Sequence, residues 1–232
     1  MDLIVEGFKQ AIILIITGDE LVVEATLRSL ETSGLAVAVA IFIGIPFGLL
    51  LALTRFPGRN IVIGMVNAGM GLPPVVVGLF VAALLWRSGL LGFLGLMYTI
   101  PAMIIAQVII ALPLVTGFTV SAIQQLNPKL KYQILALGAT RSQMLFTLIK
   151  EARLTTLAAV MAGFGAIISE VGAVMMVGGN ISRQTRVLTT AIVELVGKGD
   201  FGRAMALSII LLTLTFAATY TLTHYQQRGT RL

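Results

Sequence analysis

The sequence has no cysteine, a single histidine (His224) and few charged residues. Only 11% of its 232 residues are Asp, Glu, Lys or Arg. Without cysteine the chain forms neither a disulfide nor a thiol nucleophile, and one histidine near the C-terminus cannot build a Cys/His metal site. These absences argue against a hydrolytic enzyme and predict that the chain binds no metal and no cofactor.

Apolar residues take the place of the missing charge. Hydrophobic residues make up 57% of the chain, whereas a soluble domain is about half apolar and about a quarter charged. The 24 glycines allow helices to approach closely in lipid. The sequence therefore predicts an all-α integral membrane protein.

Five segments reach the length of about 20 predominantly apolar residues that a helix needs to cross a bilayer. They are Ser33–Thr54, Ile61–Trp86, Tyr98–Leu126, Leu154–Val177 and Ala204–His224. The run Leu3–Ile16 is shorter and contains Glu6 and Lys9, which favours a helix lying on the membrane surface over a sixth span. We therefore divide the chain into an N-terminal amphipathic helix (1–20), a transmembrane domain (21–224) and a cytoplasmic tail (225–232).

Lysine and arginine are concentrated in three parts of the chain. The connection Arg55–Asn60, the connection Asn127–Arg153 and the tail contain many Lys and Arg residues but only one acidic residue, Glu151. Because short cytoplasmic loops carry an excess of Lys and Arg, we place all three on the cytoplasmic side. With five spans, the N-terminus then lies outside.

The connection Asn127–Arg153 is amphipathic and basic, unlike the uncharged segments on either side. Asn127-Pro128 predicts a helix end, because the residue before a proline is disfavoured in helical geometry. Gly138 divides the connection into two short amphipathic helices, since glycine accepts the positive φ that ends one helix. A rigid basic helix pair is typical of a docking element, and an ordinary connector between spans is the alternative.

The stretch ALGATRSQMLFTLI (136–149) resembles the EAA loop of ABC-transporter permeases. Gly138 and the two residues after it match the centre of that motif, and the apolar residues up to Ile149 match its end. Two features differ from the family pattern. Tyr-Gln-Ile (132–134) replaces Glu-Ala-Ala, and Glu151 stands where a proline usually closes the motif.

The resemblance extends over most of the chain, from Thr26 to Leu212. Thr26–Ala52 is similar to the first core span of such permeases, and the stretch GLPPVVVGL (71–79) adds to the match. Ile168–Leu212 resembles the molybdate/tungstate branch, in which Glu-x-Gly-Ala ends a span and Gly-Asn-Ile follows. Within this branch the tungstate permeases are the most similar.

The resemblance implies the fold and partners of an ABC importer permease. The fold would be an all-α transmembrane bundle with five core spans in the cell membrane, working as a homodimer. The expected partners are two cytoplasmic ATP-binding subunits and an extracytoplasmic solute-binding protein, with no nucleic acid. The chain lacks a G-x-x-x-x-G-K-[ST] phosphate loop, so it would be non-catalytic and another polypeptide would bind ATP. The implied cargo is an oxyanion, tungstate in preference to molybdate.

The resemblance also predicts two groups of functional residues. The coupling loop (127–153) would contact the ATPase through Ala136, Gly138, Ala139, Thr140, Arg141, Leu145 and Leu148. The translocation path or its gate would include Glu170, Gly172, Pro73 and Pro74.

Glu170 is the only acidic residue deep in an expected span. A charge at the bilayer centre costs about 2.5–3.5 kcal/mol on insertion scales, so this side chain should face protein or a water-filled path. It either orients a gate by hydrogen bonding or holds helices together as a protonated or paired carboxylate. Pro73 and Pro74 remove backbone donors and mark either a broken helix lining the path or a structural kink.

Other features of the sequence leave alternatives open. Gly44 and Gly48 form a G-x-x-x-G pair, which favours close packing within one subunit over a dimer contact. Arg183 and Arg186 could attract an anion or bind the donor protein, although surface arginines commonly do neither. An ion-coupled secondary transporter would need inverted repeats, and an intramembrane enzyme would need several ionisable groups at one depth. The sequence shows neither pattern.

Overall fold

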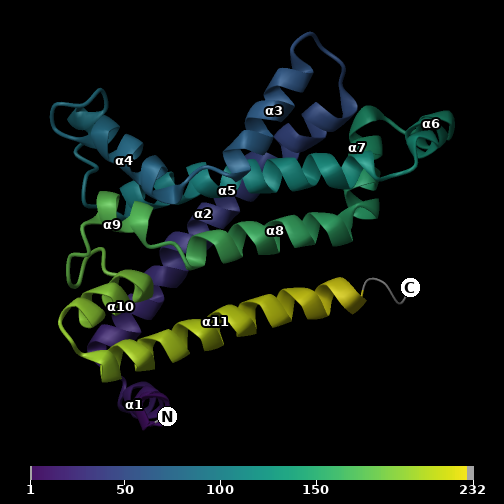
Figure 1. Cartoon of the computed structure of the whole chain (residues 1–232). Helices are drawn as coiled ribbons and strands as arrows, with labels where there is room; N and C mark the ends of the chain where they lie inside the picture. The colour runs from purple at the N-terminus through teal and green to yellow at the C-terminus, as the bar shows by residue number, and fades with distance from the viewer. Residues whose placement is uncertain (1, 229–232) are drawn as a thin grey trace.

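A computed structural model describes residues 2–228, and within this range every regular element is a helix (Figure 1). The elements are α1 (Asp2–Thr17), α2 (Glu20–Leu53), α3 (Arg59–Met70), α4 (Pro74–Leu85), the 3-10 helix η1 (Gly92–Leu94), α5 (Ile100–Gln124), α6 (Pro128–Ala136), α7 (Arg141–Glu151), α8 (Arg153–Ile168), α9 (Gly172–Gly178), α10 (Leu188–Gly197) and α11 (Phe201–Arg228). The all-α prediction is confirmed. Residues 229–232 of the predicted tail (225–232) lie outside the described range.

Helix α5 lies at the centre of the bundle, packed against α2, α3, α4, α8 and α9. Its buried face consists largely of small and β-branched residues, including Ala106, Ala111 and Val115, none of which is exposed. Small side chains let neighbouring backbones approach closely, which is how helices pack in lipid. The core around α5 therefore fixes the positions of the elements that carry the predicted site.

The G-x-x-x-G pair of α2 forms one of these close contacts. A Cβ atom at Gly44 would lie 3.0 Å from Cγ1 of Val115, and one at Gly48 would lie 2.7 Å from Cβ of Thr119. Both neighbours belong to α5 of the same chain. The prediction that this pair serves packing within one subunit is confirmed.

Polar side chains also hold the bundle together. The amide of Gln107, in the middle of α5, is only 2% exposed. Its Nε2 donates to Ser33 Oγ at 3.4 Å and to the Ile167 carbonyl at 3.2 Å. Gln107 thereby connects α5 to both α2 and α8.

Three helices, α2, α5 and α11, are long and apolar enough to cross a membrane. The number rises to five if α3 with α4, and α7 with α8, each count as one bent span. The second expected span, Ile61–Trp86, is thus two helices that meet at 104°. The fourth expected span, Leu154–Val177, is also interrupted, because α8 ends at Ile168 and α9 begins at Gly172.

Helix α2 begins at Glu20, well before the expected start at Ser33. Asp19 accepts a hydrogen bond from the Val22 amide and so caps the helix. The polar residues of this first part fit inside the helix because their hydroxyl groups hydrogen-bond to its own carbonyls. Ser29 Oγ, for example, donates to the Ala25 carbonyl at 2.8 Å. Ser29 Oγ also accepts from the Leu188 amide at 2.9 Å, which binds the start of α10 to α2.

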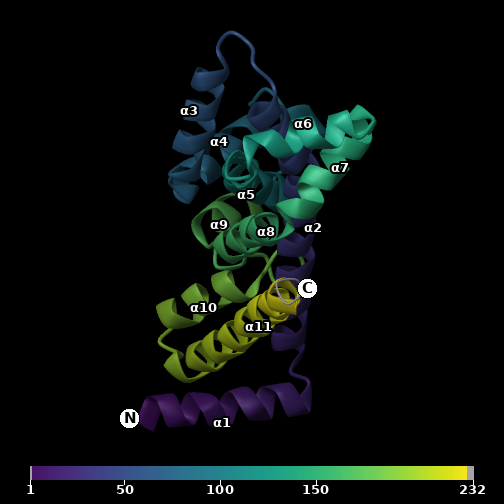
Figure 2. The same ribbon diagram turned by 90° about the vertical axis from the view of Figure 1, so that its right-hand side faces the viewer.

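Three helices, α5, α8 and α11, share a common direction, whereas α2 and α1 cross it. Figure 1 shows α5, α8 and α11 running roughly side by side, and Figure 2 shows α1 crossing the direction of α11 at a steep angle. Helix α1 packs against α11 at Gly7, where an added Cβ would collide with Met205 of α11. The surface helix for residues 1–20 stays a prediction.

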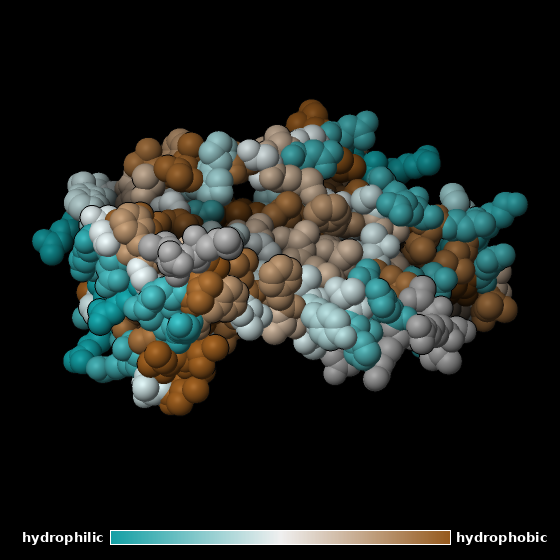
Figure 3. Space-filling model, turned by 60° about the horizontal axis from the view of Figure 1, so that its bottom comes forward, coloured by the Kyte–Doolittle hydropathy of each residue, from teal (hydrophilic) through white to brown (hydrophobic). Residues whose placement is uncertain are grey.

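The surface has apolar and polar zones. In Figure 3, hydrophilic side chains gather toward two opposite ends of the visible face, with apolar side chains between them. Many large apolar residues are exposed in the single chain, including Phe42 (82%), Ile61 (70%) and Phe216 (70%). Exposed apolar area of this extent matches a lipid-facing surface.

Candidate functional site

The coupling loop folds as two short helices, α6 and α7, joined at Gly138. Asn127 caps α6 by accepting from the Lys129 amide at 2.9 Å. Gly138 has a φ of +81°, and an added Cβ would meet no atom within 4 Å. The glycine is therefore required by backbone conformation and not by space.

Thr140 starts α7 with a reciprocal capping box. The Gln143 amide donates to Thr140 Oγ1 at 3.3 Å, and the Thr140 amide donates to Gln143 Oε1 at 2.8 Å. This motif satisfies two backbone donors at the helix start and fixes the angle of α7 after the Gly138 turn. The predicted helix–Gly–helix element is thus present, with a cap that the sequence analysis did not identify.

The coupling residues predicted from the sequence fall into two groups. Leu148 is only 2% exposed and packs with Met144 and Ile134 against the C-terminal ends of α2 and α5. Ala139 and Leu145 are half-buried beside this cluster. The remaining residues, Ala136, Gly138, Thr140 and Arg141, are exposed. The first group can anchor the loop, and only the second is placed to meet a partner.

Two strongly exposed apolar residues accompany this second group. Leu137 is 88% exposed at the end of α6, and Phe146 is 70% exposed on α7. Phe146 is not among the coupling residues predicted from the sequence, because the EAA pattern emphasises apolar positions that the structure buries. An exposed aromatic residue beside a glycine turn is the signal that could have identified it.

Helix α7 passes directly into the transmembrane region. Only Ala152 separates it from α8, the two helices meet at 70°, and Ala152 itself is 3% exposed. Because the joint is short and buried, a displacement of α7 must move the start of α8.

At its far end, α8 leads to Glu170. This carboxylate is only 9% exposed, and its Oε1 accepts from the Ala173 amide at 2.9 Å, at the start of α9. Its main-chain carbonyl accepts from Thr189 Oγ1 of α10 at 2.9 Å. Within residues 2–228 no cation pairs with Glu170. These contacts are hydrogen bonds within the chain and not an ion pair, and the role of Glu170 in a gate stays a prediction beside that of holding helices together.

The structure brings Glu170 and Gly172 beside the proline break between α3 and α4. A Cβ atom at Gly172 would lie 3.5 Å from Glu170 Oε1 and 2.5 Å from Cγ2 of Val75, the residue after Pro74. Pro73 precedes α4 as its cap, and Pro74 is its first residue. Two broken spans therefore meet at one place in the bundle, which links all four residues predicted for the path or gate.

Comparisons with known proteins give the family. The sequence profile described as "Binding-protein-dependent transport system inner membrane component" matches residues 44–231. The chain belongs to this family. It is a multi-pass permease subunit of an ABC importer in the inner membrane.

The most similar relatives include two tungstate uptake system permease proteins, both called TupB. That of Peptoclostridium acidaminophilum is 38% identical and aligns with 94% of this permease and 95% of the relative. That of Campylobacter jejuni is 35% identical, covering 98% and 95%. A probable anion ABC transporter permease of Haloferax volcanii is 40% identical over 83% of this permease and 85% of its own length.

Solved structures show the same fold. The MetNI methionine ABC transporter in an inward-facing conformation matches with a TM-score of 0.75 at 19% identity, covering 91% of this permease and 97% of that chain. A bacterial alginate ABC transporter in complex with an alginate pentasaccharide-bound periplasmic protein matches with a TM-score of 0.74 at 21% identity, covering 96% and 85%.

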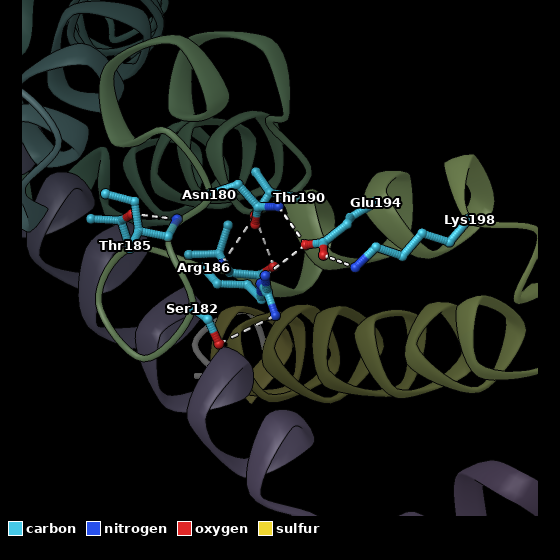
Figure 4. A network of polar contacts seen from close by, with 9 residues as sticks. Asn180, Ser182, Thr185, Arg186, Thr190, Glu194 and Lys198 are labelled. Carbon is cyan, nitrogen blue, oxygen red and sulfur yellow. Dashed lines mark hydrogen bonds and ion pairs between the residues drawn. The ribbon is translucent and has the colours of Figure 1, made fainter.

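The permease also has a polar network in the loop between α9 and α10 (Figure 4). Glu194 Oε2 pairs with Arg186 Nη2 at 2.8 Å and accepts from Asn180 Nδ2 at 2.7 Å. Its Oε1 pairs with Lys198 Nζ at 2.5 Å. The hydrogen bond from Lys198, followed by Asn180 and Arg186, lowers the pKa of Glu194 despite the opposing effect of burial.

The structure shows the partners of the two arginines of this loop, Arg183 and Arg186. Arg186 is bound to Glu194, and Arg183 pairs with Glu20 at 2.9 Å on the exposed surface. Each arginine thus has a carboxylate partner within the chain. The partly buried pair of Arg186 with Glu194 favours a structural role in fixing the loop, whereas the exposed pair of Arg183 with Glu20 contributes little.

Proposed function

We propose that this permease forms the membrane pathway of an ABC importer for tungstate. The observation that carries the proposal is the relation to two tungstate uptake permeases over nearly the whole length of each chain. Molybdate is the alternative cargo, because both ions are similar tetrahedral dianions. Selection between them would occur in the binding protein and not in the permease.

We further infer that two copies of the permease pair around a central path. No residue of α3 is buried in the single chain. Its apolar residues Ile61 and Met65 are 70% and 68% exposed, so this face is free to pack against a second copy. Five spans are too few to enclose a path, so a second copy is needed to complete it. Two ATP-binding subunits would dock on the two coupling loops, and a solute-binding protein would deliver the oxyanion from outside.

The mechanism that we propose is alternating access driven from the coupling loop. ATP-dependent closure of the ATPases would move the exposed surface of α6 and α7 toward the second copy. Through the buried joint at Ala152 this movement reaches α8, and through α8 it reaches the contact of Glu170 and Gly172 with α4. Hydrogen bonds to Glu170 would orient this gate, whereas charge repulsion disfavours direct binding of an oxyanion by an ionised carboxylate.

The test is reconstitution of the permease with its ATPase and binding protein in proteoliposomes. We expect ATP hydrolysis to rise when the binding protein carries tungstate, and labelled tungstate to accumulate on the side of release. If ATP hydrolysis rises with molybdate-loaded binding protein but not with tungstate-loaded binding protein, the cargo is molybdate. Tungstate accumulation that continues without ATPase or ATP would refute the ABC mechanism and favour ion-coupled transport.

A further inference from the structure

A basic cavity lies where the coupling loop meets the inner ends of α2 and α5. Its volume is about 590 Å³, and Arg55, Arg59 and Lys131 line it together with polar groups of Thr54 and Asn127. These three cations come from three separate elements: the end of α2, the start of α3, and α6. No acidic side chain of the described residues lines the cavity. The site therefore concentrates positive charge without an internal counter-charge.

One of the three cations is held in place by a hydrogen bond, and none is neutralised by a described acidic residue. Arg59 Nε donates to the Leu51 carbonyl at 2.6 Å, so the guanidinium is fixed while its other nitrogens remain available. Arg59 and Lys131 are both half-buried. Within residues 2–228 none of the three cations forms an ion pair. Arg55 is exposed, so two of the three cations are partly buried, and an anion from outside the chain would stabilise the group.

An apolar groove continues from this cavity toward the membrane. The groove has a volume of about 480 Å³ and shares Leu53, Thr54 and Lys131 with the basic cavity. Its other lining is chiefly apolar and includes Pro46, Leu50 and Leu145. Pro46 and Leu50 precede Arg55 on α2, so the groove runs from the level of the cations into the hydrocarbon region. Figure 2 shows α6 and α7 beside this end of α2.

We propose that the cavity and groove together bind one anionic phospholipid of the inner leaflet. The phosphate of the headgroup would lie among Arg55, Arg59 and Lys131, and an acyl chain would lie along Pro46 and Leu50. A soluble phosphate or oxyanion would use the cations but has no need of the apolar groove. Basic pockets between spans on the cytoplasmic side are suited to such headgroups.

The bound lipid would brace the coupling loop. Lys131 belongs to α6. Arg55 lies just beyond the end of α2, and the groove-lining residues Pro46 and Leu50 lie on α2 itself. A headgroup shared between them would hold α6 against the membrane domain and stiffen the element that receives the force of the ATPase. This inference goes beyond the transport function, and lipid binding is measurable without transport.

The experiment is native mass spectrometry of the detergent-purified complex of the permease with its ATPase. Delipidated complex is titrated with phosphatidylglycerol, with phosphatidylcholine of the same acyl chains, and with inorganic phosphate. The test variant is Arg55→Gln combined with Lys131→Gln. The matched control is Arg87→Gln, which removes an exposed cation from the connection at the far end of α4. The pair Arg55→Lys and Lys131→Arg preserves charge.

We expect wild type, the Arg87→Gln variant and the charge-preserving pair to bind phosphatidylglycerol in preference to phosphatidylcholine. Each lost cation should weaken phosphatidylglycerol binding about fivefold, so the double Gln variant should lose most of it. Leu50→Gln should weaken lipid binding through the groove with the cations intact. Equal binding of both lipids, displacement of phosphatidylglycerol by inorganic phosphate, or lipid binding only when the ATPase is removed would each overturn the proposal.

Discussion

Gly138 is a single residue on which the geometry of the coupling loop depends. Its φ of +81° lies in the left-handed region, which costs residues other than glycine about 1–2 kcal/mol. We predict that Gly138→Ala lowers tungstate-stimulated ATP hydrolysis of the reconstituted complex, because α6 and α7 then meet at a different angle. The permease should still fold, since the new methyl group meets no atom within 4 Å.

Two variants separate backbone conformation from other effects of this substitution. Gly34 also has open space around it but lies inside α2 without a positive φ, so Gly34→Ala should leave hydrolysis unchanged. Gly138→Asn should retain more coupling than Gly138→Ala, because asparagine tolerates the left-handed region. Equal loss from Gly138→Ala and Gly138→Asn would contradict a conformational role.

Glu194 makes the stability of the outer loop dependent on pH. Because Lys198, Asn180 and Arg186 lower its pKa below the ordinary value of 4.5, its carboxylate contributes stability that is fully present above that value. This contribution is lost as the pH falls through the lowered pKa of the folded state. We predict that the unfolding midpoint of wild type exceeds that of Glu194→Gln at neutral pH and that the difference shrinks below pH 4.5.

The measurement is thermal unfolding of the detergent-solubilised permease across this pH range. Glu6→Gln serves as control, since Glu6 is exposed on α1 and forms no ion pair within the described residues. A difference between wild type and Glu194→Gln that stays constant down to pH 3 would show that the network does not depend on the Glu194 charge.

At the scale of elements, α4 and α9 are packed so closely that one position accepts only glycine. A Cβ at Gly78 would lie 2.5 Å from Cα of Ala173, and backbone cannot move aside as a side chain can. We predict that Gly78→Ala costs about 1–3 kcal/mol of stability. For a chain of this size that corresponds to a lower unfolding midpoint by about 2–4 °C per kcal/mol.

Gly165→Ala is the matched control, because Gly165 lies in α8 with no atom within 4 Å of an added Cβ. Thermal unfolding in the same detergent should place Gly165→Ala at or above wild type. If Gly78→Ala unfolds at the wild-type temperature, α4 and α9 are not in the contact that joins the two broken spans.

A second prediction at this scale concerns the exposed face of the coupling loop. Phe146 is 70% exposed on α7, and an aromatic residue of this kind can anchor an interface. We predict that Phe146→Asp prevents co-purification of the ATPase while the permease itself remains folded. Phe93→Asp, at an 82% exposed position next to the outer end of α4, should retain the ATPase. Loss of the ATPase from both variants, or from neither, would argue against this surface.

The sequence predicts elements well where local chemistry decides them. Pro128 and Gly138 mark the limits of α6, and the predicted break at Pro73 and Pro74 is present between α3 and α4. The expected span Leu154–Val177 runs through the break after Ile168, although the Glu-x-Gly-Ala stretch that begins at Glu170 resembles a span end. Hydropathy alone did not place the break, because it depends on a contact distant in sequence, that of Thr189 with the Glu170 carbonyl. The early start of α2 depends in the same way on Ser29 and α10.

At the scale of the whole molecule, the coupling loop and the Glu194 network lie at opposite ends of the bundle. The polar ends and apolar middle in Figure 3 fit a membrane orientation in which α6 and α7 lie on one side and the loop before α10 on the other. The concentration of Lys and Arg in three parts of the sequence is enough to predict which end of the molecule faces the cytoplasm. It could not show that Leu148 is buried and Phe146 exposed, since both are apolar residues of one short helix.

The central claim is that the α6–α7 surface docks a separate ATPase on the cytoplasmic side. Because the chain contains no cysteine, a single introduced thiol is unique and can carry a cross-linker. Phe146→Cys and Leu90→Cys offer exposed positions at opposite ends of the molecule, 70% and 82% exposed. In membranes containing the assembled complex, we predict cross-linking of the ATPase to residue 146 and none to residue 90. Cross-linking to residue 90, or an active complex in which residue 146 never reaches the ATPase, would contradict the claim.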